Sequence, residues 1–90
     1  MTTMLESTIQ RKVIQWVAAH GGKAKKIKQG EGEPDLLIGY KGQLYLVEMK
    51  QEGGRVSPLQ KAIHAEWRRA GIEVHVARSL EEVIRILERG

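Results

Sequence analysis

Cysteine is absent from the 90-residue sequence. Its absence excludes a disulfide framework, a thiol nucleophile and any zinc or iron–sulfur site built on cysteine ligands. Long hydrophobic runs are also missing, because no segment approaches the roughly 18 consecutive apolar residues of a membrane span. The chain does not open with a hydrophobic signal segment either. We therefore expect a cytoplasmic protein that does not contact a membrane.

Aromatic residues and several catalytic motifs are scarce. The sequence has two tryptophans, two tyrosines and no phenylalanine. Both tryptophans fall on apolar stripes, so recognition of bases by stacking is not expected. The three histidines lack the spacing of zinc ligands, and no Ser-His-Asp arrangement is suggested. The glycines of QGEGEP are not followed by the Lys-Ser/Thr of a P-loop, so we expect no nucleotide cofactor.

Positive charge is in mild excess. The sequence has 15 lysines and arginines against 11 aspartates and glutamates, which gives a net charge of +4 and a pI near 9.6. This balance favours an anionic partner such as nucleic acid. The length allows one small domain, and no repeat or Pro- or Ser-rich linker divides it. We expect a single domain over residues 1–90.

Helical periodicity marks three segments. An apolar stripe predicts a helix over Met4–Ala19, with a capping box at Thr3-x-x-Glu6. Ser57-Pro58 begins a second helix, which ends at Gly71. Ser79-x-x-Glu82 caps the last helix. The apolar stripes comprise Leu5, Ile9, Val13, Trp16 and Val17 in the first helix, Leu59, Ala62, Ile63, Trp67 and Ala70 in the second, and Leu80, Val83, Ile84 and Leu87 in the third.

Four segments are typical of strands. Lys23–Lys28 is a lysine-rich candidate for a charged edge strand. Asp35–Tyr40 and Gln43–Lys50 are apolar and β-prone, and they predict a hairpin with Lys41-Gly42 as its turn. Ile72–Ala77 alternates like a strand with one solvated face. The order α-β-β-β-α-β-α predicts an α/β fold with a mixed sheet flanked by helices.

The hairpin register brings two carboxylates together. With Lys41-Gly42 as the turn, paired positions sum to 83, so Asp35 lies opposite Glu48. Like charges on directly opposed residues are destabilising, with Cβ atoms about 4.5–5.5 Å apart. A divalent cation between them removes this cost, because Mg²⁺ and Mn²⁺ favour carboxylate oxygens.

Lys50 shares the face of Glu48, because side chains two apart on a strand point the same way. A lysine beside a metal can stabilise developing negative charge or assist deprotonation of water. In the alternative interpretation, Glu48 and Lys50 form an ion pair at a solvated strand end and Asp35 is a turn residue.

The spacing E-P-D-(x)12-E-M-K resembles the active-site signature of the PD-(D/E)XK nuclease superfamily. Glu6 on the first helix, the glycine-rich segment GEGEPDLLIG, E-M-K and the later S-x-x-Q more narrowly resemble the VRR-NUC (virus-type replication-repair nuclease) domain. The resemblance covers the chain from about Leu5 to Leu87.

This resemblance implies a metal-dependent phosphodiesterase that uses Mg²⁺ or Mn²⁺. It implies that Asp35 and Glu48 are metal ligands, that Lys50 is the catalytic lysine, and that Glu6 and Gln60 are accessory active-site residues. We add the backbone carbonyl of Met49 as a candidate ligand. The sequence resembles the small stand-alone members of the family. That resemblance implies a homodimer that cuts branched DNA such as Holliday junctions, a phage or bacterial source, and a role in DNA repair.

The accessory residues also have simpler interpretations. Glu6 is a capping-box glutamate that favours the helix dipole, and Gln60 is a polar residue of a first helical turn. His64 shares the face of Gln60 one turn later, and we expect it at the surface.

Basic residues form two groups that suit phosphate contacts. A solvated surface is the alternative for each of them taken singly. The candidate DNA-binding residues are Lys23, Lys25, Lys26, Lys28, Arg55 and Lys61.

The sequence therefore predicts a metal-dependent, structure-specific DNA endonuclease. Two other functions stay open: a non-catalytic nucleic-acid-binding module that keeps a nuclease fold, and a small partner-binding protein whose carboxylates are incidental.

Overall fold

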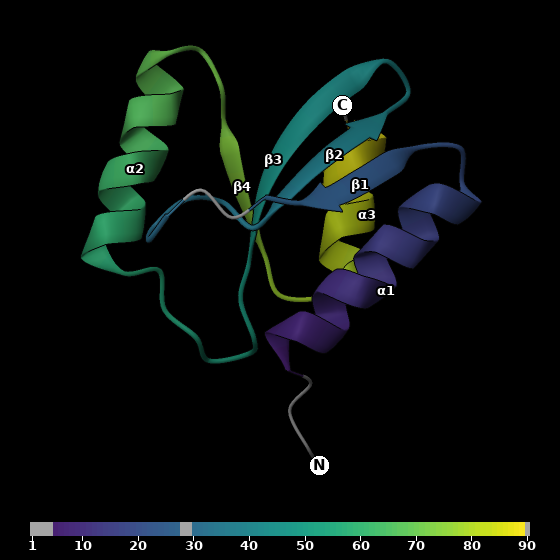
Figure 1. Ribbon diagram of the computed structural model, residues 1–90, viewed down its shortest axis with the longest axis horizontal. Coiled ribbons are helices and arrows are strands. Elements are labelled where there is room, and N and C mark those ends of the chain that lie inside the picture. Colours follow the sequence, from purple (N-terminus) through teal and green to yellow (C-terminus); the bar gives the residue numbers. More distant parts are fainter. Residues whose placement is uncertain (1–4, 28–29, 90) are drawn as a thin grey trace.

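The computed structural model describes residues 5–27 and 30–89, and its elements follow the expected order (Figure 1). The elements are α1 (Glu6–Ala19), β1 (Lys23–Lys26), β2 (Leu36–Tyr40), β3 (Gln43–Met49), α2 (Pro58–Arg69), β4 (Val74–Ala77) and α3 (Leu80–Arg89). The predicted α/β class and the order α-β-β-β-α-β-α are confirmed. None of these three helices, over the residues described, is long and apolar enough to cross a membrane.

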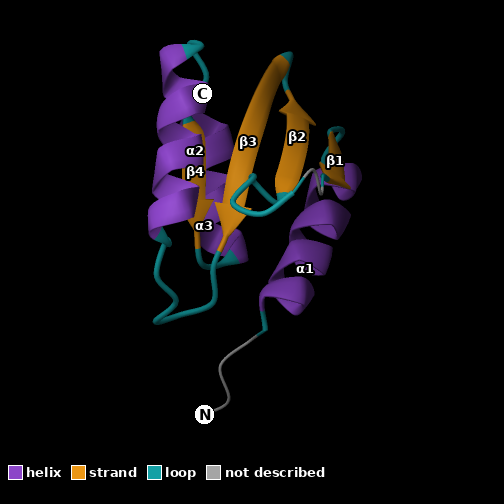
Figure 2. Cartoon of the chain, turned by 60° about the vertical axis from the view of Figure 1, so that its left-hand side comes forward, coloured by secondary structure: helices purple, strands orange, loops and turns teal. Residues whose placement is uncertain are grey.

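The four strands form one mixed sheet in the order β1-β2-β3-β4 (Figure 2). β1 and β3 both pair with β2 in antiparallel fashion, whereas β4 runs parallel to β3 after the crossover through α2. The hairpin has the predicted register, for example Leu37 opposite Leu46. Lys41 and Gly42 both have positive φ, 50° and 79°, as a two-residue turn of type I′ requires.

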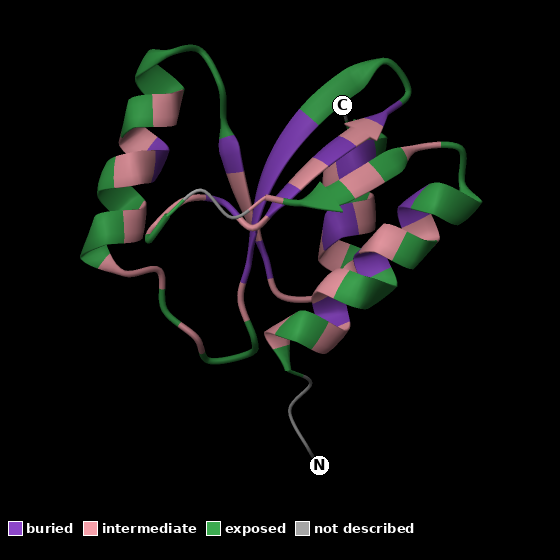
Figure 3. Cartoon of the chain, viewed as in Figure 1, coloured by how far each residue is buried: buried purple, intermediate pink, exposed green. Residues whose placement is uncertain are grey.

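The apolar core lies between the sheet and the pair α1 and α3. Figure 3 shows buried residues along the strands and on the inner sides of these two helices. Helical spacing buries Ile9, Val13 and Val17 of α1, and Val83 and Leu87 of α3. The stripes expected for the first and last helices are thus largely confirmed, although Leu5 is exposed.

Helix α2 lies on the opposite face of the sheet, and its expected apolar stripe is wrong. Its one buried residue is His64, while Leu59 is 47% exposed (Figure 3). Two of its apolar residues meet the loop before β2: a Cβ added to Gly32 would lie 2.9 Å from Cγ of Leu59 and 3.2 Å from Cγ1 of Ile63. The helix is therefore turned so that an imidazole faces the strands.

Several element bounds are shorter than expected. α1 begins at Glu6 after Leu5, which provides no side-chain cap, and Thr3 of the expected capping box lies outside the described residues. Lysine-rich β1 is an edge strand as expected, but it ends at Lys26, and Lys28 also lies outside the described residues. β2, β3 and β4 are each one or two residues shorter than predicted at one end.

The two other expected helix starts are capped. Ser57 and Gln60 form a reciprocal capping box at α2. At α3, Oγ of Ser79 accepts a hydrogen bond from the backbone N–H of Glu82, while the Glu82 carboxylate accepts one from the N–H of Arg78. These caps satisfy N–H groups that a helix start leaves without partners.

Candidate active site

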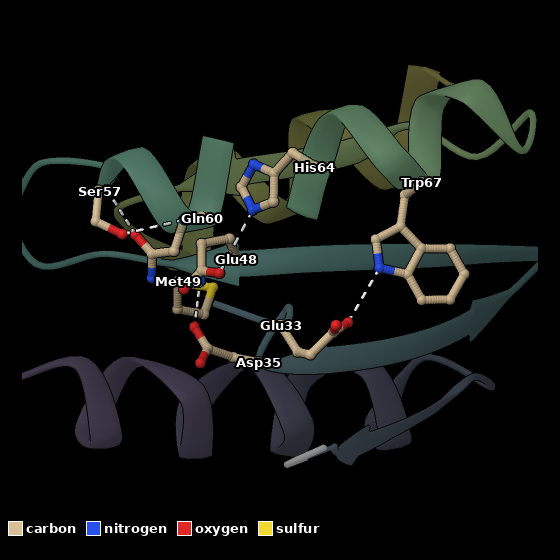
Figure 4. A network of polar contacts seen from close by, with 8 residues as sticks. All are labelled: Glu33, Asp35, Glu48, Met49, Ser57, Gln60, His64 and Trp67. Carbon is tan, nitrogen blue, oxygen red and sulfur yellow. Dashed lines mark hydrogen bonds and ion pairs between the residues drawn. The ribbon is translucent and has the colours of Figure 1, made fainter. Parts of the chain in front are cut away.

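Asp35 lies immediately before β2 and is bound to β3 by two hydrogen bonds. Its backbone N–H donates to the carbonyl of Val47 at 3.1 Å, and its Oδ2 accepts from the N–H of Met49 at 2.8 Å (Figure 4). Ladder pairing ends at Leu36 and Val47. Asp35 therefore lies close to Glu48, as the predicted register requires, although the two residues are not a pair of the ladder. One backbone and one side-chain hydrogen bond hold it against β3.

Glu48 is 2% exposed and lies on the sheet face covered by α2. The pKa of its carboxyl is raised from the ordinary 4.5 to about 8, mainly by burial, with a hydrogen bond to Asp35 and repulsion by that carboxylate adding to the rise. The positive charge of Lys50 lowers the pKa of Glu48, whereas Glu6 raises it. Burial and a neighbouring carboxylate both oppose the ionisation of Glu48. A bound cation would stabilise its ionised form.

Lys50 and Glu6 approach the carboxyl pair from two different elements. Lys50 follows β3 and is half-buried, and its backbone N–H donates to the carbonyl of Ala77 at 2.9 Å, which fixes it beside β4. Glu6 is half-buried in the first turn of α1. Both charges act on Glu48, so four of the predicted site residues come to one end of the sheet.

Gln60 has a structural role that uses one end of its amide. Its Oε1 accepts a hydrogen bond from the N–H of Ser57 at 2.9 Å, which is half of the capping box. Its side-chain nitrogen points away from Ser57, toward the strands (Figure 4). The capping oxygen is thus committed, and the nitrogen is the group left for a substrate.

His64 is buried, so the expectation of a surface histidine is wrong. Nε2 of His64 lies 3.6 Å from Oε1 of Glu48, and the two side chains point at each other (Figure 4). Burial lowers the pKa of His64, as does the positive charge of Arg68. Since the pKa of Glu48 is raised, this contact joins two neutral groups at neutral pH rather than an ion pair, although its length falls within the ion-pair range.

Two further contacts hold the surroundings of the site, and neither was anticipated from the sequence. Nε1 of Trp67 donates to Oε1 of Glu33 at 3.1 Å, which ties α2 to the loop before Asp35. Nη2 of Arg78 donates to the carbonyl of Gly54 at 2.8 Å and holds the loop between β3 and α2. Local patterns carry no signal for such pairs, whereas the spacing of four between Gln60 and His64 did place both on one face.

The donor set fits a hard divalent cation. Mg²⁺ is commonly bound by one or two carboxylates and completes its coordination with water and substrate phosphate. Asp35 and Glu48 supply two such carboxyl groups, and Oε1 of Glu48 has no hydrogen-bond partner although it is buried. Across residues 5–27 and 30–89, no group of three or more His, Asp or Glu side chains is placed to hold a metal ion.

Exposed lysines of the edge strand lie on both faces of the sheet. Lys23 pairs with Gly39 and Lys25 with Leu37, so both share the face that carries Glu48. Lys26 points to the other face. Arg55 in the loop after β3 and Lys61 on α2 are also exposed.

The sequence pattern of the VRR-NUC domain family matches residues 3–81. The chain belongs to the VRR-NUC family. A solved structure described as a "VRR_NUC domain" is 30% identical to this chain and covers 92% of it and 94% of its own length, with a TM-score of 0.78. A second, described as a "VRR_NUC domain protein", is 20% identical and shares the fold with a TM-score of 0.80, over 97% of this chain and 88% of that chain. No curated protein matches this chain in sequence.

Family membership confirms the resemblance that the motifs suggested. VRR-NUC is a nuclease-family domain. In this VRR-NUC domain the E-P-D and E-M-K segments meet at one end of the sheet, where Asp35 contacts β3 and Glu48 faces α2.

Proposed function

We propose that this chain is an Mg²⁺- or Mn²⁺-dependent, structure-specific DNA endonuclease. The observation that carries the proposal is the pair of carboxyl groups of Asp35 and Glu48, close enough that Asp35 helps to raise the pKa of Glu48, while the positive charge of Lys50 lowers it. Fold stability alone gives no reason to bury a carboxyl against a second carboxyl, because burying a charge costs free energy unless it is paired. A divalent cation supplies the missing partner.

Each residue has a defined role in this proposal. Asp35 and Glu48, with the backbone carbonyl of Met49, would hold the cation, which when bound polarises the phosphate and makes water more acidic. The Lys50 ammonium stabilises negative charge while a water oxygen bonds to phosphorus and one P–O ester bond breaks. The free amide nitrogen of Gln60 orients the phosphate, and Glu6 adds negative charge beside the pair.

DNA reaches the site along a basic surface. Exposed Lys23 and Lys25 lie on the sheet face that carries Glu48, and exposed Arg55 and Lys61 flank the site from the loop and α2. Contacts from lysine and arginine to phosphates position DNA without reading its sequence. This favours a target defined by DNA structure, such as a four-way junction.

A homodimer follows from the proposed substrate. One chain carries one carboxyl pair, and a symmetric cut of a junction needs two sites related by a two-fold axis. Exposed apolar side chains on the α2 side support a partner surface: Leu44 is 70% exposed and Ile72 42%. They border a groove of about 170 Å³ lined by Leu37, Leu44, Tyr45, Leu46, Trp67 and Ile72. Light scattering of the purified protein measures the oligomeric state directly.

Cleavage of labelled DNA tests the function. Four-way junctions, flaps, forks and plain duplex are incubated with wild type, Glu48→Gln and Glu88→Gln in Mg²⁺, Mn²⁺ or EDTA. We expect divalent-dependent cleavage by wild type and by Glu88→Gln, whose exposed carboxylate lies on α3, and none by Glu48→Gln. Binding without cleavage in any metal would instead favour a non-catalytic nucleic-acid-binding module, and equal cleavage by Glu48→Gln would refute the assigned site.

A further inference from the structure

His64 is the one residue of α2 that the structure buries, and it is a polar one. Its relative exposure is 7%. Leu59 and Ile63 of the helix lie instead against the loop at Gly32, and Leu59 is 47% exposed. Helix α2 therefore presents an imidazole to the strand that carries Glu48 (Figure 4).

One atom of the imidazole and one of the carboxyl group lack a hydrogen-bond partner. Nε2 of His64 and Oε1 of Glu48 are both buried and form no hydrogen bond with the described residues, and 3.6 Å separates them. A hydrogen bond between nitrogen and oxygen needs about 2.7–3.2 Å, so a shift of roughly half an ångström would close it. Buried polar atoms are almost always hydrogen-bonded. Two buried, unpaired atoms that face each other therefore suggest a hydrogen bond that forms when the side chains shift slightly.

Contacts on both sides of His64 fix where its ring stands. Four residues earlier, Gln60 is locked into the capping box with Ser57. Three residues later, Trp67 donates to Glu33, two residues before Asp35. Helix α2 is thereby tied to the strand segment that carries Asp35, while its imidazole faces the strand that carries Glu48.

Two oxygen atoms near the carboxyl pair already accept hydrogen bonds from backbone N–H groups. Oδ2 of Asp35 accepts from the N–H of Met49, and Oε1 of Gln60 accepts from Ser57. Nε2 of His64 is the buried nitrogen that faces Oε1 of Glu48.

We propose that His64 is a positioning residue for the metal ligand Glu48: its Nε2–H donates to Oε1 and holds the carboxylate so that its other oxygen is directed toward the cation shared with Asp35. This inference rests on the proposed function, because it assigns a role toward the same metal site. Partners behind metal ligands fix ligand orientation, and their loss commonly weakens metal binding 10- to 100-fold. His64 contacts neither substrate nor the reacting atoms in this role.

Binding of Mn²⁺ alone, measured by calorimetry without DNA, tests the role apart from activity. His64→Leu removes the donor and keeps an apolar side chain of similar bulk, while His64→Gln keeps an N–H donor. His75→Leu is the matched control, since His75 lies half-buried against Tyr45 on the other face of the sheet. Thermal unfolding checks that each variant folds, and His64→Gln carries the comparison if His64→Leu does not fold.

We expect Mn²⁺ to bind His64→Leu about 10- to 100-fold more weakly than wild type, in line with the loss of other partners behind metal ligands. Binding to His64→Gln should fall by much less, and His75→Leu should match wild type. Junction cleavage by His64→Leu should recover at high Mn²⁺. Unchanged Mn²⁺ affinity in His64→Leu, or cleavage lost at every Mn²⁺ concentration, overturns the positioning role while the proposed nuclease stands. If wild type itself neither binds Mn²⁺ nor cleaves, the proposed function fails and the inference with it.

Discussion

Oδ2 of Asp35 accepts a hydrogen bond of 2.8 Å from the backbone N–H of Met49, the residue that follows Glu48. The carboxylate that immediately precedes β2 is thus attached to the backbone of β3. Its place relative to Glu48 is set by the sheet and not only by its own rotamer. Sites built on paired strands keep their geometry better than sites on loops, and this bond gives a two-carboxylate site that rigidity.

Substitutions of Asp35 separate its charge from this attachment. Asp35→Asn keeps a side-chain carbonyl that accepts from Met49, so we expect near-normal stability and loss of divalent-dependent cleavage. Asp35→Ala loses the acceptor as well and leaves a half-buried N–H without its partner, which costs about 1–2 kcal/mol. Urea denaturation and junction cleavage measure the two effects. Equal stability of both variants would show that the bond does not support the fold.

Glu48 gives the metal-free protein a characteristic pH dependence. The pKa of its carboxyl in the folded protein, about 8, lies above the ordinary 4.5, so the folded state holds the proton more tightly than the unfolded chain. Its contribution to stability is complete below about pH 4.5 and is lost as the pH rises toward 8. In EDTA, the Tm of wild type should therefore fall relative to that of Glu48→Gln between pH 5 and 8.

The comparison with Glu48→Gln isolates one of two opposing effects. His64, whose pKa is lowered, makes stability rise with pH, and it is present in both proteins. Addition of Mn²⁺ at pH 8 should restore the Tm of wild type but not that of the variant, because a ligand that binds the folded state stabilises it. Parallel Tm curves in EDTA would contradict the shifted ionisation of Glu48.

The hairpin and the two core helices could be predicted because their signals are local. A two-residue turn and a period of two fix the register that places Asp35 near Glu48, and stripes at helical spacing identify the inner sides of α1 and α3. Helix α2 could not be oriented in this way. Its apolar residues form an equally good stripe, yet Leu59 and Ile63 pack on the loop at Gly32 and His64 is the buried residue that faces the sheet.

The contacts around the site depend on partners far apart in the chain. Glu33 and Trp67 are separated by 34 positions, and Arg78 reaches Gly54 across 24. No periodicity or short motif links such pairs, so the sequence identified the carboxylates but not the side chains that hold their surroundings.

The bond between Trp67 and Glu33 should control local opening of α2. A typical hydrogen bond contributes about 1 kcal/mol to stability. This bond matters for α2 because His64 is the only residue that the helix buries. Trp67→Phe and Glu33→Ala should therefore speed amide hydrogen exchange over residues 58–69 by a similar factor, while exchange over 80–89 stays unchanged. Glu33→Gln keeps an acceptor and should behave like wild type. Equal exchange in all variants would show that the bond does not hold α2.

Gly22 allows α1 to turn tightly onto the sheet. A Cβ at this position would lie 2.6 Å from the carbonyl oxygen of Gly39 and 2.8 Å from Cγ1 of Val17. Gly22→Ala should therefore lower the free energy of unfolding by roughly 2–3 kcal/mol, as overpacking does. Gly21→Ala meets no atom within 4 Å and is strained only by its φ of +88°, so it should cost about 1 kcal/mol. Urea denaturation of the two variants checks the order.

Alternation along the edge strand makes two neighbouring lysines differ in their effect on DNA. Lys25 pairs with Leu37 and shares the face of Glu48, whereas Lys26 pairs with Leu36 and points to the face covered by α1 and α3. Lys25→Gln and Lys26→Gln remove the same charge from the same exposed strand, so each is the control for the other.

If DNA lies across the face that carries Glu48, Lys25→Gln should weaken binding to a four-way junction. It should also reduce the slope of log K against log salt by about 0.9, the value for one lost phosphate contact on duplex DNA. Lys26→Gln should leave the slope unchanged. Fluorescence anisotropy in EDTA between 50 and 200 mM salt, roughly the range where such slopes are resolved, measures both. Equal slopes for the two variants would place the DNA elsewhere on the molecule.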